Sequence, residues 1–395
     1  MNLFSLKIIA LSILSLVTST ANTTTIGVTY NPSATTNNLP TPEQVASTLL
    51  SHLHVSSVHL LNPTPAAIRA FSYSNISLLL TIPNDLISSF AANISSATQW
   101  VYTYVLPFHP RARISLISLG SDVVSSLPSM LDPTTDPSTL LIPAMRNLQQ
   151  SLYVLGIRTI PVSTTFSYIS IITTTFPPSS AEFQEPINNL LIKPVLQFLD
   201  ENNSSFLIDI HPFNVYKLRS EIPVGFALFQ DIPYNFRDDA ITGARYRNLF
   251  DMMVDGVIAA LANFGHQNIP MIVTQTGWPS AGEDGDGSEV SPAFAQIYLK
   301  GLISHLKSGL GTPLRKDGLA EVYVYELFDE ASDVINSNRT EMWGILYPNM
   351  TKKFSIDFSG SARAFGRGNL GIYGNSLLVD LVLPFLMGIF VSLTL

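Results

Sequence analysis

The chain has 395 residues, of which 46% are hydrophobic and 13% are charged, and its formal net charge is -8 at pH 7. A mildly acidic chain with few Lys and Arg residues lacks the basic surface that nucleic-acid binding requires. Cysteine is absent, which excludes disulfides and thiolate metal sites. We therefore expect a neutral partner, no nucleic acid, no metal and no cofactor.

Residues 1–21 are predicted to form a secretory signal peptide. Lys7 precedes an apolar run over residues 8–17, and residues 19–21 are small enough for cleavage. The run is too short to span a bilayer. The mature chain is then expected to begin at Asn22, and the alternative is a buried N-terminal helix.

Short apolar segments alternate with segments of helical spacing through the body of the chain. Strands are predicted at residues 26–30, 57–61, 77–81, 114–119, 159–163, 206–210, 271–274 and 322–327. Helices are predicted at residues 42–52, 97–106, 144–155, 187–201, 246–264 and 292–307. This α/β alternation predicts a single (β/α)8 TIM barrel over residues 22–358. An open doubly wound sheet is the alternative, because periodicity does not reveal closure.

Residues 359–395 are predicted to be the signal for a glycosylphosphatidylinositol (GPI) anchor. Small residues for lipid attachment are Ser359, Gly360 and Ser361, a spacer follows over residues 363–375, and residues 377–395 are mostly apolar. We therefore expect a protein on the outer face of the plasma membrane or in the cell wall. A spanning helix or an unprocessed tail is the alternative.

Asn-x-Ser/Thr sequons fit passage through a glycosylating compartment. They lie at Asn22, Asn75, Asn93, Asn202, Asn203, Asn338 and Asn349.

Distinctive motifs lie at or after the predicted strands. They include Gly120-Ser121-Asp122-Val123, Gly277-Trp278-Pro279-Ser280, Phe328-Asp329-Glu330 and Trp343-Gly344. Together with weaker markers they resemble the plant endo-1,3-β-glucanases of glycoside hydrolase family 17, and the resemblance runs from residue 26 to about residue 358. It implies a TIM barrel whose chemistry lies at the carboxyl ends of the strands.

The resemblance implies a retaining glycosidase, in which two carboxyl groups roughly 5 Å apart serve as acid/base and nucleophile. The acid/base Glu of the family falls on Asp122, and its nucleophile Glu falls on Gln275. Asp is one methylene shorter than Glu, and a neutral amide is a poor nucleophile. Glu330 and Glu341 match supporting carboxylates of the family, although ordinary loop carboxylates are the alternative. We expect hydrolysis to be lost or strongly weakened, as in a pseudoenzyme.

Substitution against the family pattern extends around the predicted site. Asn, Arg, Tyr and Asp of the family are replaced by Thr29, His59, Leu61 and Asn62, and Asn-x-Tyr-Pro is replaced by Asp209-Ile210-His211-Pro212. Asp209 and Glu326 are carboxylates gained relative to the family. A rewired enzyme is therefore an open alternative, provided that these side chains point into the cleft.

Sugar binding requires aromatic faces and a few hydrogen-bonding groups. Candidate substrate-binding residues are Tyr30, Asp209, His211, Phe213, Trp278 and Phe328, and Tyr325 is a further aromatic candidate. Packing inside the barrel is the alternative for each aromatic ring.

The leading hypothesis is a monomeric cell-surface protein that binds callose-like β-1,3-glucan with little or no hydrolysis. The first alternative is an active endo-1,3-β-glucosidase in which Asp122 works with Asp209. The second is a structural surface protein that no longer recognises sugar.

Overall fold

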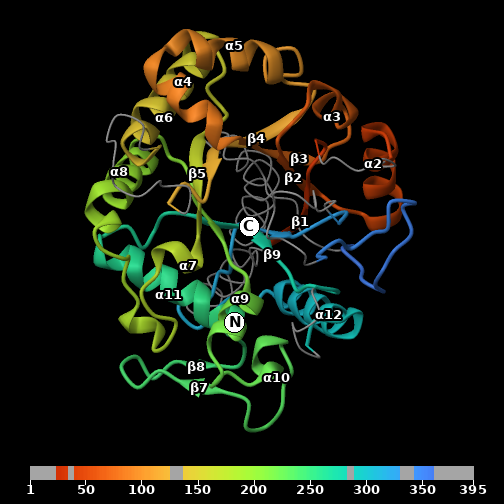
Figure 1. Cartoon of the computed structure of the whole chain (residues 1–395), viewed down its shortest axis with the longest axis vertical. Coiled ribbons are helices and arrows are strands. Elements are labelled where there is room, and N and C mark those ends of the chain that lie inside the picture. The colour runs from red at the N-terminus through yellow and green to blue at the C-terminus, as the bar shows by residue number, and fades with distance from the viewer. Residues whose placement is uncertain (1–23, 34–39, 125–136, 283–288, 330–341, 360–395) are drawn as a thin grey trace, which may run out of the picture. The chain divides into compact units, whose positions relative to one another are not determined.

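Parallel strands close into one barrel at the centre of the fold, in the order β1-β10-β9-β6-β5-β4-β3-β2 (Figure 1). The computed structural model describes residues 24–33, 40–124, 137–282, 289–329 and 342–359. The strands are β1 Thr25–Tyr30, β2 Ser57–Leu61, β3 Ser77–Ile82, β4 Arg113–Ser121, β5 Val162–Ser167, β6 Phe206–Asp209, β9 Met271–Thr276 and β10 Glu321–Val324. The predicted (β/α)8 barrel is therefore confirmed, and closure excludes the open sheet.

Helices surround the barrel, as Figure 1 shows. They include α2 Pro42–Thr48, α3 Pro65–Ala70, α4 Ile87–Ala92, α5 Ile94–Tyr104, α6 Pro137–Val154, α8 Lys193–Glu201, α11 Leu249–Asn263 and α12 Pro292–Ser308. Further short elements follow β5 and β6, namely α7 Tyr168–Ile171, α9 Pro212–Leu218, α10 Val224–Ala227 and the hairpin of β7 Arg237–Asp238 with β8 Arg245–Tyr246. In the described part of the chain, none of the helices has both the length and the apolar character needed to cross a membrane.

Several helices begin where the sequence offers a side-chain cap. The Thr41 hydroxyl accepts from the backbone N–H of Gln44 (3.4 Å), and the Gln44 side chain accepts from the Thr41 N–H (2.9 Å), which forms a capping box at α2. Thr64, Asn248 and Ser291 cap α3, α11 and α12 in a similar way. These caps satisfy backbone donors that the first helical turn leaves without partners.

Three element predictions are corrected by the structure. The sequence predicts the fifth strand at residues 159–163, but β5 begins at Val162 because Pro161 has no N–H for the ladder. The sequence predicts that the last strand extends to residue 327, but β10 ends at Val324. The Glu326 N–H donates to the Trp343 carbonyl (3.3 Å) instead of to a neighbouring strand. The helix predicted from residue 246 begins at Leu249, because Tyr246 pairs in the hairpin.

The hydrophobic core has two parts. A large cluster includes most of the buried apolar side chains of strands and helices. A smaller cluster joins one residue from each of five strands, namely Leu79, Leu116, Leu207, Ile272 and Tyr323. Side chains alternate along a strand, so this second set fills the interior of the barrel. The packed interior supports the polar residues at the carboxyl ends of the strands.

Candidate active site at the mouth of the barrel

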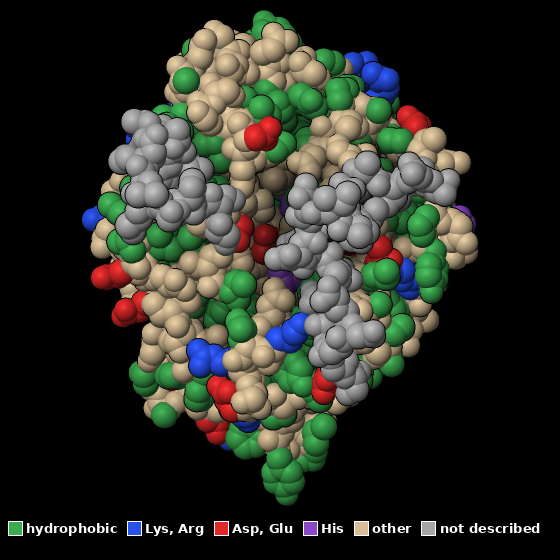
Figure 2. All heavy atoms as spheres, in the orientation of Figure 1, with side chains coloured by type: hydrophobic (Ala, Val, Ile, Leu, Met, Phe, Trp, Pro, Cys, Tyr) green, Lys and Arg blue, Asp and Glu red, His purple; other side chains and the backbone are tan. Residues whose placement is uncertain are grey.

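A cavity of about 500 Å³ lies at the carboxyl ends of the barrel strands. Figure 2 shows a hollow on this face with acidic and histidine side chains inside it. Six of the barrel strands contribute to the lining, and Asn31 and Tyr325 directly follow the other two, β1 and β10. The lining residues are Asn31, Leu61, Asn62, Thr81, Ile82, Pro83, Asn84, Ser121, Asp122, Ser167, Ile169, Asp209, His211, Asn214, Gln275 and Tyr325. Active sites of TIM barrels occupy this position.

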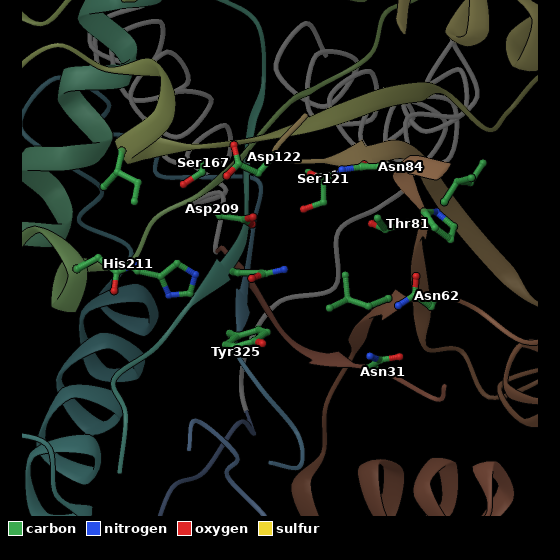
Figure 3. A pocket seen from close by; sticks show the side chains of 16 residues that line it. Asn31, Asn62, Thr81, Asn84, Ser121, Asp122, Ser167, Asp209, His211 and Tyr325 are labelled. Carbon is green, nitrogen blue, oxygen red and sulfur yellow. Dashed lines mark hydrogen bonds between the residues drawn. The ribbon is translucent and has the colours of Figure 1, made fainter. Parts of the chain in front are cut away.

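Asp122 follows the end of β4 and is held there by its neighbours. Asn84 makes two hydrogen bonds to the backbone of Ser121, the residue before Asp122. Its Nδ2 donates to the Ser121 carbonyl (2.9 Å), and its Oδ1 accepts from the Ser121 N–H (2.8 Å). A Cβ at Gly120 would lie 2.7 Å from that Oδ1 atom, so glycine permits the close approach. The Ser170 hydroxyl donates to Oδ2 of Asp122 (3.2 Å). The carboxylate is thus positioned at the cavity wall (Figure 3).

Gln275 and Asp209 lie side by side on β9 and β6. They are register partners in the sheet, and each is 7% exposed. The Thr274 hydroxyl donates to Oδ1 of Asp209 (2.6 Å), which draws this carboxylate toward β9. Both residues line the cavity, so the structure brings Asp122, Asp209 and Gln275 to one site.

A buried histidine lies beneath this group. Nδ1 of His59 is 3.0 Å from the Thr274 carbonyl oxygen, and Nε2 is 2.7 Å from Oγ1 of Thr81. The Thr29 hydroxyl donates to the same Thr274 carbonyl (3.1 Å). Burial lowers the pKa of His59 to about 4, although its hydrogen bond to Thr274 opposes the shift. Burial thus favours the neutral form of the ring.

Four of the aromatic residues predicted to bind sugar pack against one another in two pairs. Phe213 and Trp278 are 0% and 2% exposed, and their ring centroids are 5.1 Å apart in an edge-to-face arrangement. Tyr30 packs edge-on against Phe328 at 6.2 Å. All four lie outside the lining of the cavity. Their contacts are those of core packing.

His211 and Tyr325 differ from these four residues because they do line the cavity. Their rings meet edge to face at 5.7 Å, and Trp343 packs against both. Tyr325 is labelled on the cavity in Figure 3, opposite the carboxylates in that view. It is the aromatic candidate that the structure brings to the site.

The electrostatic character of the lining is acidic to neutral. Its charged side chains are Asp122 and Asp209, and no Lys or Arg is among the residues that line the cavity. Asn and Gln side chains supply both donors and acceptors. Over the residues that the structure describes, no three His, Asp or Glu side chains are grouped as metal ligands would be. The lining offers hydrogen bonds that suit a neutral polar ligand.

Other predicted positions lie away from the cavity or outside the described residues. Glu326 is 4% exposed and is not part of the lining. The sequon residues Asn75, Asn93, Asn203 and Asn349 are exposed, as is Ser359, whereas Asn202 is half-buried. Glu330, Glu341, Asn22, Asn338, Gly360 and Ser361 lie outside the described residues.

Polar lining residues that sequence reasoning missed include Asn31, Ser167 and Asn214. Asn31 and Ser167 stand at the ends of β1 and β5, where a barrel presents its functional side chains. Their position relative to the strands was therefore a usable signal. Asn214 lies on α9, a short helix that the sequence pattern did not predict.

Comparison with known proteins agrees with this geometry. Residues 26–358 match the family model described as glycosyl hydrolases family 17. The chain is 31% identical to glucan endo-1,3-beta-glucosidase 13 of Arabidopsis thaliana over 92% of its own length and 70% of that protein. It is 33% identical to glucan endo-1,3-beta-glucosidase 12 of Arabidopsis thaliana over 85% of its length and 60% of the relative. It thus spans only part of these longer proteins.

Solved structures of related proteins have the same fold. A beta-1,3-glucanase and allergen of Cryptomeria japonica pollen superposes with a TM-score of 0.75 at 30% identity, covering 85% of this chain and 99% of that one. A plant beta-glucan endohydrolase superposes with a TM-score of 0.72 at 30% identity, covering 84% and 99% of the two chains. The family match, which covers nearly the whole barrel, establishes that this chain belongs to glycosyl hydrolases family 17.

Proposed function

We propose that the protein binds β-1,3-glucan at the mouth of the barrel and that its hydrolytic activity is lost or strongly weakened. The names of its relatives, glucan endo-1,3-beta-glucosidases, support the ligand class. The observation that supports the loss of activity is that an amide, Gln275, lines the cavity, at the position where the resemblance in sequence implies the nucleophile of the family. A retaining mechanism needs a carboxylate there, because the enzyme must form a covalent bond to the anomeric carbon.

The cavity supports binding on chemical grounds. Sugar hydroxyls both donate and accept hydrogen bonds, and the lining has amides, hydroxyls and carboxylates that match them. Tyr325 contributes an aromatic surface at the same site. These groups need no charge on the ligand, which favours a neutral polysaccharide.

Residual hydrolysis is the second candidate function, and Asp209 is the observation that favours it. Its carboxylate lines the cavity together with Asp122. In this version Asp122 protonates the glycosidic oxygen, while Asp209 activates water as a general base. Glu326 is less suited to that role because it is buried away from the lining.

The proposal includes an extracellular site of action. A cleaved signal over residues 1–21 and a lipid anchor near Ser359 would hold a monomeric barrel at the outer face of the plasma membrane, next to cell-wall glucan. Exposed sequons such as Asn75 and Asn349 are compatible with that compartment.

Purified protein should be tested for both binding and turnover. We expect calorimetry to detect laminarihexaose binding, and a reducing-sugar assay at high protein concentration to show little or no cleavage of laminarin. Asp122→Asn is the matched control for any residual cleavage, because it removes the proposed acid while keeping the size of the side chain. Rapid cleavage by the parent protein would overturn the proposed loss of activity, and absence of binding would overturn the proposed ligand.

A further inference from the structure

The hydrogen bonds of His59 determine where its ring proton resides. A carbonyl oxygen can only accept, so the 3.0 Å contact with Thr274 requires a hydrogen on Nδ1. The neutral ring then has no hydrogen on Nε2, which must accept. With the hydrogen on Nε2 instead, the bare Nδ1 would face the carbonyl oxygen, and two lone pairs would repel each other.

Thr81 is the partner that donates to Nε2. Its Oγ1 lies 2.7 Å from that nitrogen, so its hydroxyl proton points down to His59. Thr81 also lines the cavity, and Figure 3 places its hydroxyl among the lining groups. The hydroxyl oxygen then presents only lone pairs to a ligand, since a hydroxyl has a single proton to donate.

We propose that His59 acts as a positioning residue that fixes the hydrogen-bond polarity of Thr81, so that the floor of the cavity accepts a hydrogen bond from a sugar hydroxyl and does not donate one. Thr81 thereby becomes a specificity-determining residue for a ligand group that must donate. The ligand class rests on the proposed glucan binding, whereas the polarity of Thr81 does not depend on it.

The surroundings of His59 keep the ring neutral. Tyr323 from β10 packs edge-on at 5.7 Å, and its hydroxyl donates to the buried Glu321 carboxylate. Burial raises the pKa of Tyr323 well above its usual value and also raises the pKa of Glu321. The Asp209 carboxylate accepts from the Thr274 hydroxyl, and no cited contact joins it to the His59 ring. The cited contacts thus give the ring no direct carboxylate partner that would favour a second proton.

The first experiment measures the tautomer without any ligand. Long-range proton–nitrogen correlation spectra of ¹⁵N-histidine-labelled protein at pH 6 should show the hydrogen of His59 on Nδ1 and a bare Nε2. His59→Gln assigns the signal, because the chain has seven His and six remain in the variant. A hydrogen on Nε2 would overturn the proposed polarity of Thr81.

The second experiment tests the consequence for ligands with laminaribiose and its monodeoxyfluoro analogues. Fluorine cannot donate, so replacing the hydroxyl that meets Thr81 should weaken binding by about tenfold, which corresponds to one hydrogen bond. Thr81→Val should abolish this difference and Thr81→Ser should keep it. His59→Phe should reduce it, because the Thr81 proton becomes free to turn toward the cavity.

The outcomes separate the two proposals. If His59→Phe weakens binding of every analogue by the same factor, its role is structural and the polarity proposal fails. If no laminaribiose analogue binds, the proposed glucan ligand fails, while the nitrogen spectrum still decides whether His59 orients Thr81.

Discussion

Asp209 and Gln275 are register partners on the adjacent strands β6 and β9, and both line the cavity. Adjacent strands lie about 4.8 Å apart, so the two side chains share one small region. A carboxylate beside an amide avoids the like-charge repulsion that two neighbouring carboxylates would create. The proposed loss of a carboxylate at position 275 is therefore compatible with a carboxylate at Asp209.

The rate of hydrolysis in engineered variants should depend on the residue at position 209 as well as on the residues at positions 122 and 275. We predict that Asp122→Glu combined with Gln275→Glu gives measurable hydrolysis of laminarin. Adding Asp209→Asn should increase the rate further, because it removes a neighbouring charge that raises the pKa of the new nucleophile. The initial rate of reducing-end release measures both effects.

The control for this series is Asp122→Glu with Asp209→Asn while Gln275 is retained. It should stay inactive, because the nucleophile is still missing. A folded triple variant that binds laminarihexaose but cleaves nothing would show that other substituted residues, such as His59, also prevent the reaction.

Asn84 is predicted to stabilise the segment that carries Asp122. Asn84→Ala removes both hydrogen bonds to the Ser121 backbone, so the free energy of unfolding should fall by about 1–3 kcal/mol. Urea denaturation measures the change. Asn214→Ala is the matched control, because Asn214 also lines the cavity but lies on α9 and not beside the end of β4. Its free energy of unfolding should lie within about 0.5 kcal/mol of the parent value. Equal decreases in the free energy of unfolding of the two variants would contradict the role of Asn84 in holding the end of β4.

The strands were readable from the sequence because buried parallel strands form short apolar runs, as in β6 and β9. Local motifs predicted positions for Asp122 and Gln275 at the mouth of the barrel, and both line the cavity. The hydrogen bonds between Asn84 and the Ser121 backbone were not predicted, because they join residues 37 positions apart. The burial of Phe213 and Trp278 depends on the direction of each ring, which strand order and local pattern do not determine.

Phe213 should contribute to stability rather than to sugar contact. Phe213→Leu should reduce the free energy of unfolding by about 1–3 kcal/mol, because the ring is fully buried against Trp278 and Trp343. The affinity for laminarihexaose, measured at a temperature where the variant is folded, should remain within about twofold. Tyr325→Ala should instead weaken binding, because that side chain lines the cavity. If Phe213→Leu lost much affinity for laminarihexaose and Tyr325→Ala did not, Phe213 would contact the sugar.

The pair of His305 and Asp251, away from the cavity, should make stability depend on pH. Nε2 of His305 lies 2.8 Å from Oδ1 of Asp251, and the two side chains are 20% and 7% exposed. Burial acts to lower the pKa of His305, but the hydrogen bond and the charge of Asp251 outweigh it, so the pKa is raised above 6.5. A raised pKa means that the folded state holds the proton more tightly than the unfolded state. The stabilisation is thus complete below about pH 6.5 and is lost as the pH rises through the folded-state pKa.

We therefore predict that His305→Gln lowers the free energy of unfolding by about 1.5–3 kcal/mol at pH 5.5, as expected for loss of a charged hydrogen bond. The difference from the parent should shrink by pH 8.5, when the parent histidine is neutral. Urea denaturation at both pH values measures it. His266→Gln is the control, since its partner Asp200 is 55% exposed and such a pair contributes little. A difference for His305→Gln that stays constant or widens with pH would show that its bond to Asp251 does not depend on the second proton.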